Sequence, residues 1–189
     1  MSRNQIWVAR HGATEWAENG RHTGRTDIPL TEEGRAQAVA MRDRIASRKF
    51  ALVLVSPLQR ARETCRLLGL DDIAEVDDDL EEWDYGDYEG LTTAQVRGSR
   101  PGWTVFGDGV MPGGEDINEV GVRADRVIAR ADAVDGEVAF IAHGHILRIV
   151  GARWIDDDPL EAANLALDTA TLSVLGFEHE RKVIRSWNC

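Results

Sequence analysis

This chain has little cysteine, a deficit of positive charge and no long apolar run. Its 189 residues include two cysteines, Cys65 and Cys189, whose separation fits no metal-binding or redox motif, so we expect Cys65 to be a small buried apolar residue. Lysine and arginine number 22 against 33 aspartate and glutamate, and the net charge of -11 excludes a surface built for nucleic acid. No segment is apolar enough over sufficient length to span a bilayer or form a signal-peptide core. We therefore expect a cytoplasmic protein that binds neither membrane nor nucleic acid.

The rest of the composition is that of an ordinary globular chain. Hydrophobic residues make up 43% and charged residues 29%, and we find no internal repeat and no biased tract. A chain of this length suits one compact core, so residues 1–189 are predicted to form a single domain. The stretch 91–115 is rich in glycine and proline, and we expect it to form a lid-like excursion from that domain.

Strand-like and helix-like patterns alternate along the chain. Strands are expected at residues 6–9, 51–55, 73–76 and 138–142, with a terminal hairpin at 171–177 and 182–187. Helices are expected at residues 31–46, 56–68, 116–133 and 146–155, the first of them capped by Thr31. In the second helix, Ser56 is predicted as the N-cap and Gln59 as the partner that completes a capping box. This order predicts an α/β fold, a three-layer α/β/α sandwich with a mostly parallel central sheet and helices on both faces.

Charged and polar residues follow three of the predicted strands, at the point where each strand ends. Arg10-His11-Gly12 follows the first strand, the segment 56–62 follows the second, and His143-Gly144-His145 follows the last before the hairpin. Because ligands of such sheets bind in the crevice at the carboxyl ends of the strands, these groups are expected to converge. Helix N-termini and arginine guanidinium groups both favour anions, so the sequence predicts a pocket for a phosphoryl group.

Further short motifs accompany these segments in a fixed order. They are Thr14 with Trp16, the segment 23–27, Pro29-Leu30-Thr31 with Gly34, the segment 56–64, Glu82 with Tyr85-Gly86 and Glu89-Gly90, and Ala142-His143-Gly144. Over nearly the whole chain this series resembles the histidine phosphatase superfamily, also called phosphoglycerate mutase-like. The segments 82–90 and 142–145 most resemble a branch of small sugar-phosphate phosphatases that includes sedoheptulose-bisphosphatase-type enzymes.

The resemblance implies a role for each residue of the predicted pocket. His11 would be the nucleophile that forms a phosphohistidine, Glu82 the proton donor with Glu81 as its adjacent rival, and His143 a further catalytic residue. Phosphate contacts are implied from Arg10, Arg60, Thr23, Gly24 and Gly144. Three residues could line the rim, namely His22, His145 and Arg62. For His145 a role in orienting His143 and a purely structural role in the following helix both stay open.

The expected function is a metal-independent phosphomonoesterase that acts on a small phosphorylated metabolite such as a sugar phosphate, with no cofactor. Zinc bound by His11, His143 and His145 is conceivable, but the neighbouring arginines would repel a cation. A mutase is one alternative, although the excursion offers only Arg97 and Arg100, and Ala17 stands where mutases carry asparagine. Leu58 stands where the bisphosphatase branch carries arginine. A non-catalytic sensor of a phosphorylated ligand is the other alternative, and a homodimer is a further possibility.

Overall fold

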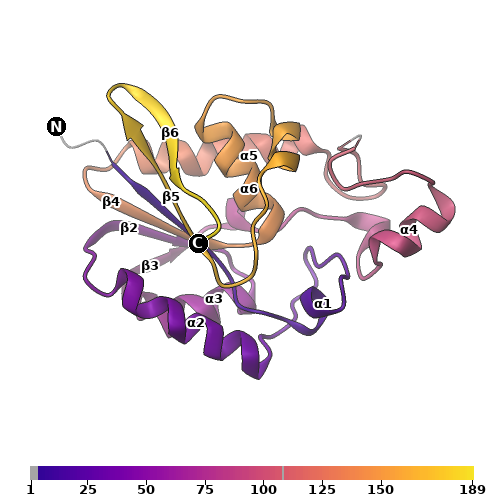
Figure 1. Cartoon of the computed structure of the whole chain (residues 1–189), viewed down its shortest axis with the longest axis horizontal. Helices are drawn as coiled ribbons and strands as arrows, with labels where there is room; N and C mark the ends of the chain where they lie inside the picture. Colours follow the sequence, from indigo (N-terminus) through magenta and orange to yellow (C-terminus); the bar gives the residue numbers. More distant parts are fainter. Residues whose placement is uncertain (1–3, 108) are drawn as a thin grey trace.

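The computed structural model describes residues 4–107 and 109–189, and within them six strands form one mixed sheet in the order β3-β2-β4-β1-β5-β6 (Figure 1). The strands are β1 (Ile6–Arg10), β2 (Phe50–Val55), β3 (Ala74–Val76), β4 (Glu137–Ala142), β5 (Leu172–Glu178) and β6 (Arg181–Ser186). The first four are parallel, whereas β5 and β6 form the predicted hairpin and join β1 in antiparallel orientation. The predicted mostly parallel α/β sheet is confirmed.

Helices cover both faces of this sheet (Figure 1). They are α1 (Glu15–Glu18), α2 (Glu32–Ile45), α3 (Gln59–Leu68), α4 (Thr93–Ser99), α5 (Ile117–Asp132) and α6 (Gly144–Trp154). Side chains alternate between the faces along a strand, so in β2 Val53 and Val55 pack toward α2 and α3, while Leu54 packs into the core shared with α5 and α6. Burial on both faces explains why residues 53–55 of β2 and 138–142 of β4 are apolar without interruption.

The start of α3 differs from the prediction. Thr31 caps α2 as expected, accepting a hydrogen bond from the Gly34 N–H at 3.1 Å. In contrast α3 begins at Gln59 after Leu58, and no side chain of its own segment caps it, so the predicted Ser56 N-cap and capping box are wrong. Asp27, far away in sequence, accepts the Gln59 N–H at 2.8 Å instead. A tertiary cap has replaced the local one, and within its own segment the Ser56 hydroxyl accepts a long hydrogen bond from the Leu58 N–H, at 3.4 Å.

The excursion at 91–115 is more ordered than its composition indicates. It contains α4, which begins with a complete capping box formed by Thr92 and Gln95. Several of its apolar side chains are buried in the main core, among them Val96, Trp103 and Met111. Asp108 of this segment lies outside the described residues. The segment thus lies beyond the sheet in Figure 1 but remains anchored to the domain by its apolar side chains.

Among the described helices, none combines the length and the apolar character that a membrane crossing demands.

Candidate active site

The carboxyl ends of β1 and β4 bring two histidines together. The strands are parallel neighbours, with Arg10 paired to Ala142, so the residues that follow them leave the sheet side by side. The ring centroids of His11 and His143 lie 5.1 Å apart, and the two residues are 5% and 0% exposed. The predicted convergence of these two strand ends is therefore present in the structure.

One ring nitrogen of His11 carries no hydrogen and has a free electron pair. His11 Nδ1 lies 2.7 Å from the carbonyl oxygen of Gly12, which can only accept, so the ring hydrogen resides on Nδ1. Burial, with help from the positive charges of Arg60 and Arg10, lowers the pKa of His11 to about 3. The imidazole is thus neutral, and Nε2 is the unprotonated nitrogen that a nucleophile requires.

His143 is held in the opposite way, because both of its nitrogens have partners. Arg60 donates its Nε hydrogen to His143 Nδ1 at 3.1 Å, so the ring hydrogen is on Nε2. That nitrogen lies 2.7 Å from Ser56 Oγ, which accepts it. Burial and the charge of Arg60 hold the pKa of His143 well below its usual range. His143 is therefore a neutral ring fixed between a cation and a hydroxyl group.

Arg60 connects these two histidines to the loop of residues 19–31 between α1 and α2, which we call the first loop. Its side chain is fully buried, and it donates from Nη1 to the Thr26 carbonyl at 2.9 Å and from Nη2 to the Gly24 carbonyl at 2.8 Å. Together with the bond to His143, these contacts join residues from α3, the first loop and the end of β4. Arg60 thus contributes its positive charge from behind the histidines while fixing the loop beside them.

Arg10 has an unsatisfied donor beside the same histidines. Nη1 donates to the Leu167 carbonyl, but the buried Nε has no hydrogen-bond partner among the residues that the structure describes. A Cβ atom at Gly144 would lie 3.2 Å from Arg10 Cζ, so glycine leaves this guanidinium the space it occupies. A buried N–H on a cation without an acceptor is rare and costly. It indicates a place for an anion.

Glu82 precedes α5 in the chain but packs against the first turn of α6, and it is 4% exposed. Its Oε1 accepts the N–H groups of Trp83 at 3.0 Å and Ile146 at 2.9 Å, and its Oε2 accepts the N–H of His145 at 3.0 Å. Burial alone would raise the pKa of Glu82, but the backbone N–H of His145 and the proximity of the His145 and His143 rings outweigh it and hold the pKa well below its usual range. Glu81, the rival proton donor, instead forms an ion pair with Arg25, whose Nε lies 3.5 Å from Glu81 Oε2.

These groups surround a cavity of about 70 Å³. A buried water needs roughly 10–15 Å³ of such space, so the four heavy atoms of a phosphoryl group can be accommodated. The cavity is lined by Arg10, His11, Thr14, Ala17, Arg21, His22, Thr23, Glu82, Tyr85 and His145. Six of the residues predicted for the site therefore face one space. Three other residues predicted for the site are not among the lining residues, namely Arg60, His143 and Gly144.

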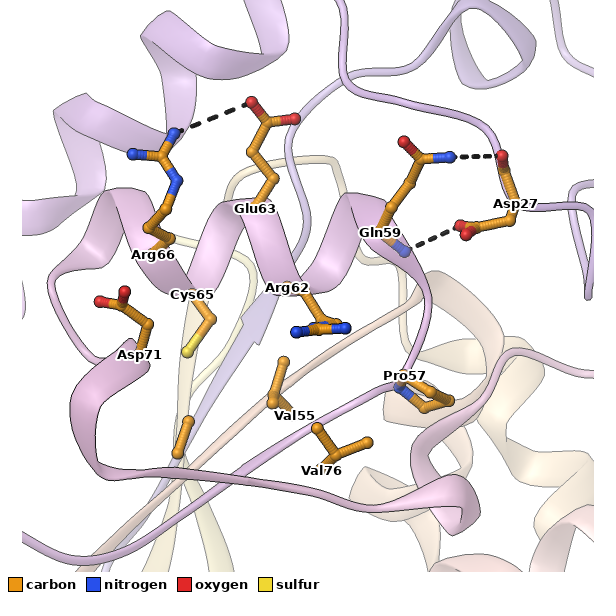
Figure 2. Close-up of a pocket in the computed structure, with 11 residues that line it drawn as sticks. Asp27, Val55, Pro57, Gln59, Arg62, Glu63, Cys65, Arg66, Asp71 and Val76 are labelled. Carbon is orange, nitrogen blue, oxygen red and sulfur yellow. Dashed lines mark hydrogen bonds and ion pairs between the residues drawn. The ribbon is translucent and has the colours of Figure 1, made fainter.

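Two further predicted contacts are arranged differently. The Gly24 N–H donates to both carboxylate oxygens of Glu89, at 2.9 and 3.0 Å, so it is already engaged within the protein. Arg62 does not line the catalytic cavity but a separate one of about 390 Å³, between α3 and the ends of β2 and β3. Figure 2 shows its guanidinium group near Val55 and Val76. We assign the chemistry to the smaller cavity because it holds the histidines, Glu82 and the unsatisfied arginine donor.

Tyr85 and Ser56 both form hydrogen bonds with site histidines, a role that their sequence motifs did not predict. The Tyr85 hydroxyl lies 2.5 Å from His145 Nδ1, and Tyr85 is 1% exposed. Its spacing of three residues from Glu82 within one motif was a usable signal for Tyr85. Ser56 had only its position at the end of β2, which local helix-capping rules explain equally well.

Comparison with known proteins yields consistent matches over most of the chain. The sequence model of the histidine phosphatase superfamily (branch 1) matches residues 6–189. An acid phosphatase of Mycobacterium tuberculosis is 40% identical over 180 residues, covering 93% of this chain and 88% of its own. Sedoheptulose 1,7-bisphosphatase of Saccharomyces cerevisiae is 34% identical over 181 residues, covering 78% of this chain and 66% of its own. The solved structure of an open reading frame product from Mycobacterium tuberculosis has a TM-score of 0.92 at 37% identity, covering 98% of this chain and 97% of its own.

Proposed function

Because this chain belongs to the histidine phosphatase superfamily and is a phosphatase of that kind, we propose that it hydrolyses the monoester of a small phosphorylated metabolite without a metal, through a phosphohistidine on His11. One observation carries the proposal. His11 holds its hydrogen on Nδ1 against the Gly12 carbonyl and faces the cavity together with Arg10, whose Nε has no acceptor within the described residues. A nucleophile and an anion site thus share one space.

In the first step Nε2 of His11 attacks phosphorus, and the bond from phosphorus to the ester oxygen breaks. The departing oxygen takes a proton from Glu82, which has gained it because an adjacent phosphate dianion favours protonation of a carboxyl group. In the second step water attacks phosphorus, Glu82 accepts the proton of that water, and the bond to Nε2 breaks. Arg10 and Arg60 offset the charge on the phosphoryl oxygens throughout, which is the main requirement of phosphoryl transfer.

The cavity lining favours hydrolysis over transfer back to a bound product. A mutase must retain a charged intermediate, yet among the described lining residues only Arg10 and Arg21 add basic groups to the histidines. Ala17 lines the same wall with a methyl group. A sugar phosphate is the substrate class that we propose, because one of the similar proteins is a sugar bisphosphatase. Cytoplasmic location and a homodimer stay predictions.

The experiment is turnover of p-nitrophenyl phosphate in the presence of EDTA, combined with trapping of the intermediate from a ³²P-labelled substrate. We expect turnover that EDTA does not change and a labelled protein whose phosphate is lost in acid but not in base. His11→Ala should abolish both, whereas His179→Ala, in the exposed turn between β5 and β6, should change neither. Binding of phosphate without turnover would instead identify a sensor, and full activity of His11→Ala would overturn the mechanism.

A further inference from the structure

Glu82, the proposed proton donor, is surrounded by hydrogen-bond donors that favour its unprotonated form. The function proposed above needs a proton on Glu82 when the alcohol leaves, but in the free protein its two oxygens accept three backbone N–H groups, which favour the carboxylate. A fourth donor would stabilise the carboxylate further and weaken Glu82 as an acid. The nearest side chain that could supply one is His145, whose Nδ1 lies 3.8 Å from Glu82 Oε2.

The other charged or titratable groups near Glu82 come from several elements. Three arginines keep their positive charge at any working pH, namely Arg10 from β1, Arg60 from α3 and Arg148 from α6. Burial lowers the pKa of three further histidines, His11, His22 and His143, so these rings are neutral. Glu89 faces Tyr85 but is engaged by the backbone of the first loop. What remains adjustable beside Glu82 is the ring of His145.

Tyr85 decides which nitrogen of that ring carries the hydrogen. Burial and the proximity of Glu82 raise the pKa of Tyr85 well above its usual value, so its hydroxyl keeps its hydrogen. A buried hydroxyl needs an acceptor, and across the described chain the one within reach is His145 Nδ1, at 2.5 Å. Burial lowers the pKa of His145, so the ring is neutral and its hydrogen is on Nε2. Nδ1 therefore has no hydrogen to offer Glu82.

We propose that Tyr85 is a positioning residue: by donating its hydrogen to His145 Nδ1, it prevents that nitrogen from donating to Glu82 and leaves Glu82 able to take up the proton of catalysis. The inference rests on the proposed function. The proton enters from solvent when a phosphate dianion lies beside Glu82. As the ester bond breaks, its electron pair goes to the alcohol oxygen, which takes this proton, and Glu82 returns to the carboxylate.

The surroundings of His145 make this arrangement specific. Its ring centroid lies 5.2 Å from that of Phe106 and 6.5 Å from that of Trp83, so two aromatic side chains besides Tyr85 pack near it. Removing the Tyr85 hydroxyl leaves the ring in place but frees Nδ1 to hold the hydrogen. A donor directed at Oε2 then stabilises the carboxylate, and Glu82 loses its proton at lower pH.

The test is the pH dependence of kcat for Tyr85→Phe with two substrates, glycerol 3-phosphate and p-nitrophenyl phosphate. The alkaline limb reports the group that must be protonated in the enzyme–substrate complex. We expect Tyr85→Phe to move that limb to lower pH by about one unit. At pH 7, kcat should fall roughly tenfold with glycerol 3-phosphate and less than about twofold with p-nitrophenyl phosphate, whose leaving group needs little protonation.

A second background tests the route of the effect. In His145→Leu the ring that could donate is gone, so adding Tyr85→Phe should leave the alkaline limb where His145→Leu alone puts it. Tyr88→Phe is the matched control, because its buried hydroxyl accepts from Arg100 instead and does not line the cavity. It should not move the limb. Thermal unfolding of each variant verifies that it is folded.

Each failure has its own meaning. An unmoved limb in Tyr85→Phe, or an equal shift with and without His145, overturns the role of Tyr85 while the phosphatase activity stands. An alkaline limb that persists in Glu82→Gln removes Glu82 as the acid and the inference with it. Absence of turnover in the unaltered enzyme refutes the proposed function itself.

Discussion

His11 and His143 end neighbouring parallel strands, are both buried and lie with their rings 5.1 Å apart, yet they are bound in opposite ways. His11 uses one nitrogen on the Gly12 carbonyl and leaves the other unprotonated. His143 accepts from Arg60 with one nitrogen and donates to Ser56 with the other. Position, burial and residue type are thus shared, and the hydrogen bonds alone separate the ring that we propose as the nucleophile from a fixed neutral ring.

The largest expected difference comes from removing each ring in turn. His11→Asn keeps a donor for the Gly12 carbonyl but has no nucleophilic nitrogen, so activity should fall by about 10³-fold or more, with stability changed by less than about 1 kcal/mol. His143→Ala leaves the buried Arg60 Nε without an acceptor, and the free energy of unfolding should fall by about 2–4 kcal/mol. Urea denaturation and turnover measurements on both variants make the comparison.

His143→Asn is the control for that loss, because its carbonyl oxygen can accept from Arg60. It should recover part of the stability lost in His143→Ala. If His11→Asn destabilises the protein as strongly as His143→Ala, the two rings do not differ in the way their hydrogen bonds indicate.

An intermediate effect is expected from pH. The pKa of His11 is about 3 in the folded protein, below the ordinary value of 6.5, so between these values the unfolded chain binds more protons. The free energy of unfolding should therefore be highest above pH 6.5. As the pH decreases from 6.5, it should fall by up to about 1.4 kcal/mol per pH unit for each such histidine. Urea denaturation from pH 7 to pH 4 measures the slope. His11→Asn should lessen the slope, and identical slopes for the two proteins would contradict the burial of a neutral His11.

The smallest effect should come from Ser56→Ala, which removes the acceptor for His143 Nε2 and a long contact, at 3.4 Å, with the Leu58 N–H. One buried hydrogen bond contributes about 1 kcal/mol, so the free energy of unfolding should fall by about that amount. The freed ring can turn, and kcat should decrease a few-fold. Ser173→Ala, at an equally buried serine that accepts from the Asn188 N–H, is the matched control. It should lose similar stability with unchanged kcat, and an equal kcat effect in both would remove Ser56 from the site.

The fold and the meeting of the strand ends could be predicted because they depend on local patterns. Uninterrupted apolar runs identified β2 and β4, and parallel order then required His11 and His143 to emerge at the same edge. The resemblance of motifs supplied the candidate roles of Glu82 and Arg60. Nothing in these steps needed the geometry of a particular side chain.

The hydrogen bonds that distinguish the site residues could not be predicted in this way. The Glu89 carboxylate takes the Gly24 N–H across 65 residues of sequence, and Ser56 meets His143 across 87. Ser56 was assigned to helix capping because its local sequence favours that, but Asp27 provides the cap from a distant loop. The local sequence indicates which hydrogen bonds a residue can form, whereas tertiary contacts determine which of them it does form.

Arg60 makes the assembly of the site cooperative. Its guanidinium is satisfied only when the first loop, α3 and the end of β4 have all reached their final positions, since each contributes a partner or the side chain itself. If any one of these segments opens, the buried charge of Arg60 loses hydrogen-bond partners. The free-energy cost of that loss is far larger than that of one neutral hydrogen bond. A molecule with a partly formed site is therefore disfavoured, and catalytic activity should measure the fully folded population rather than a graded series of loosened forms.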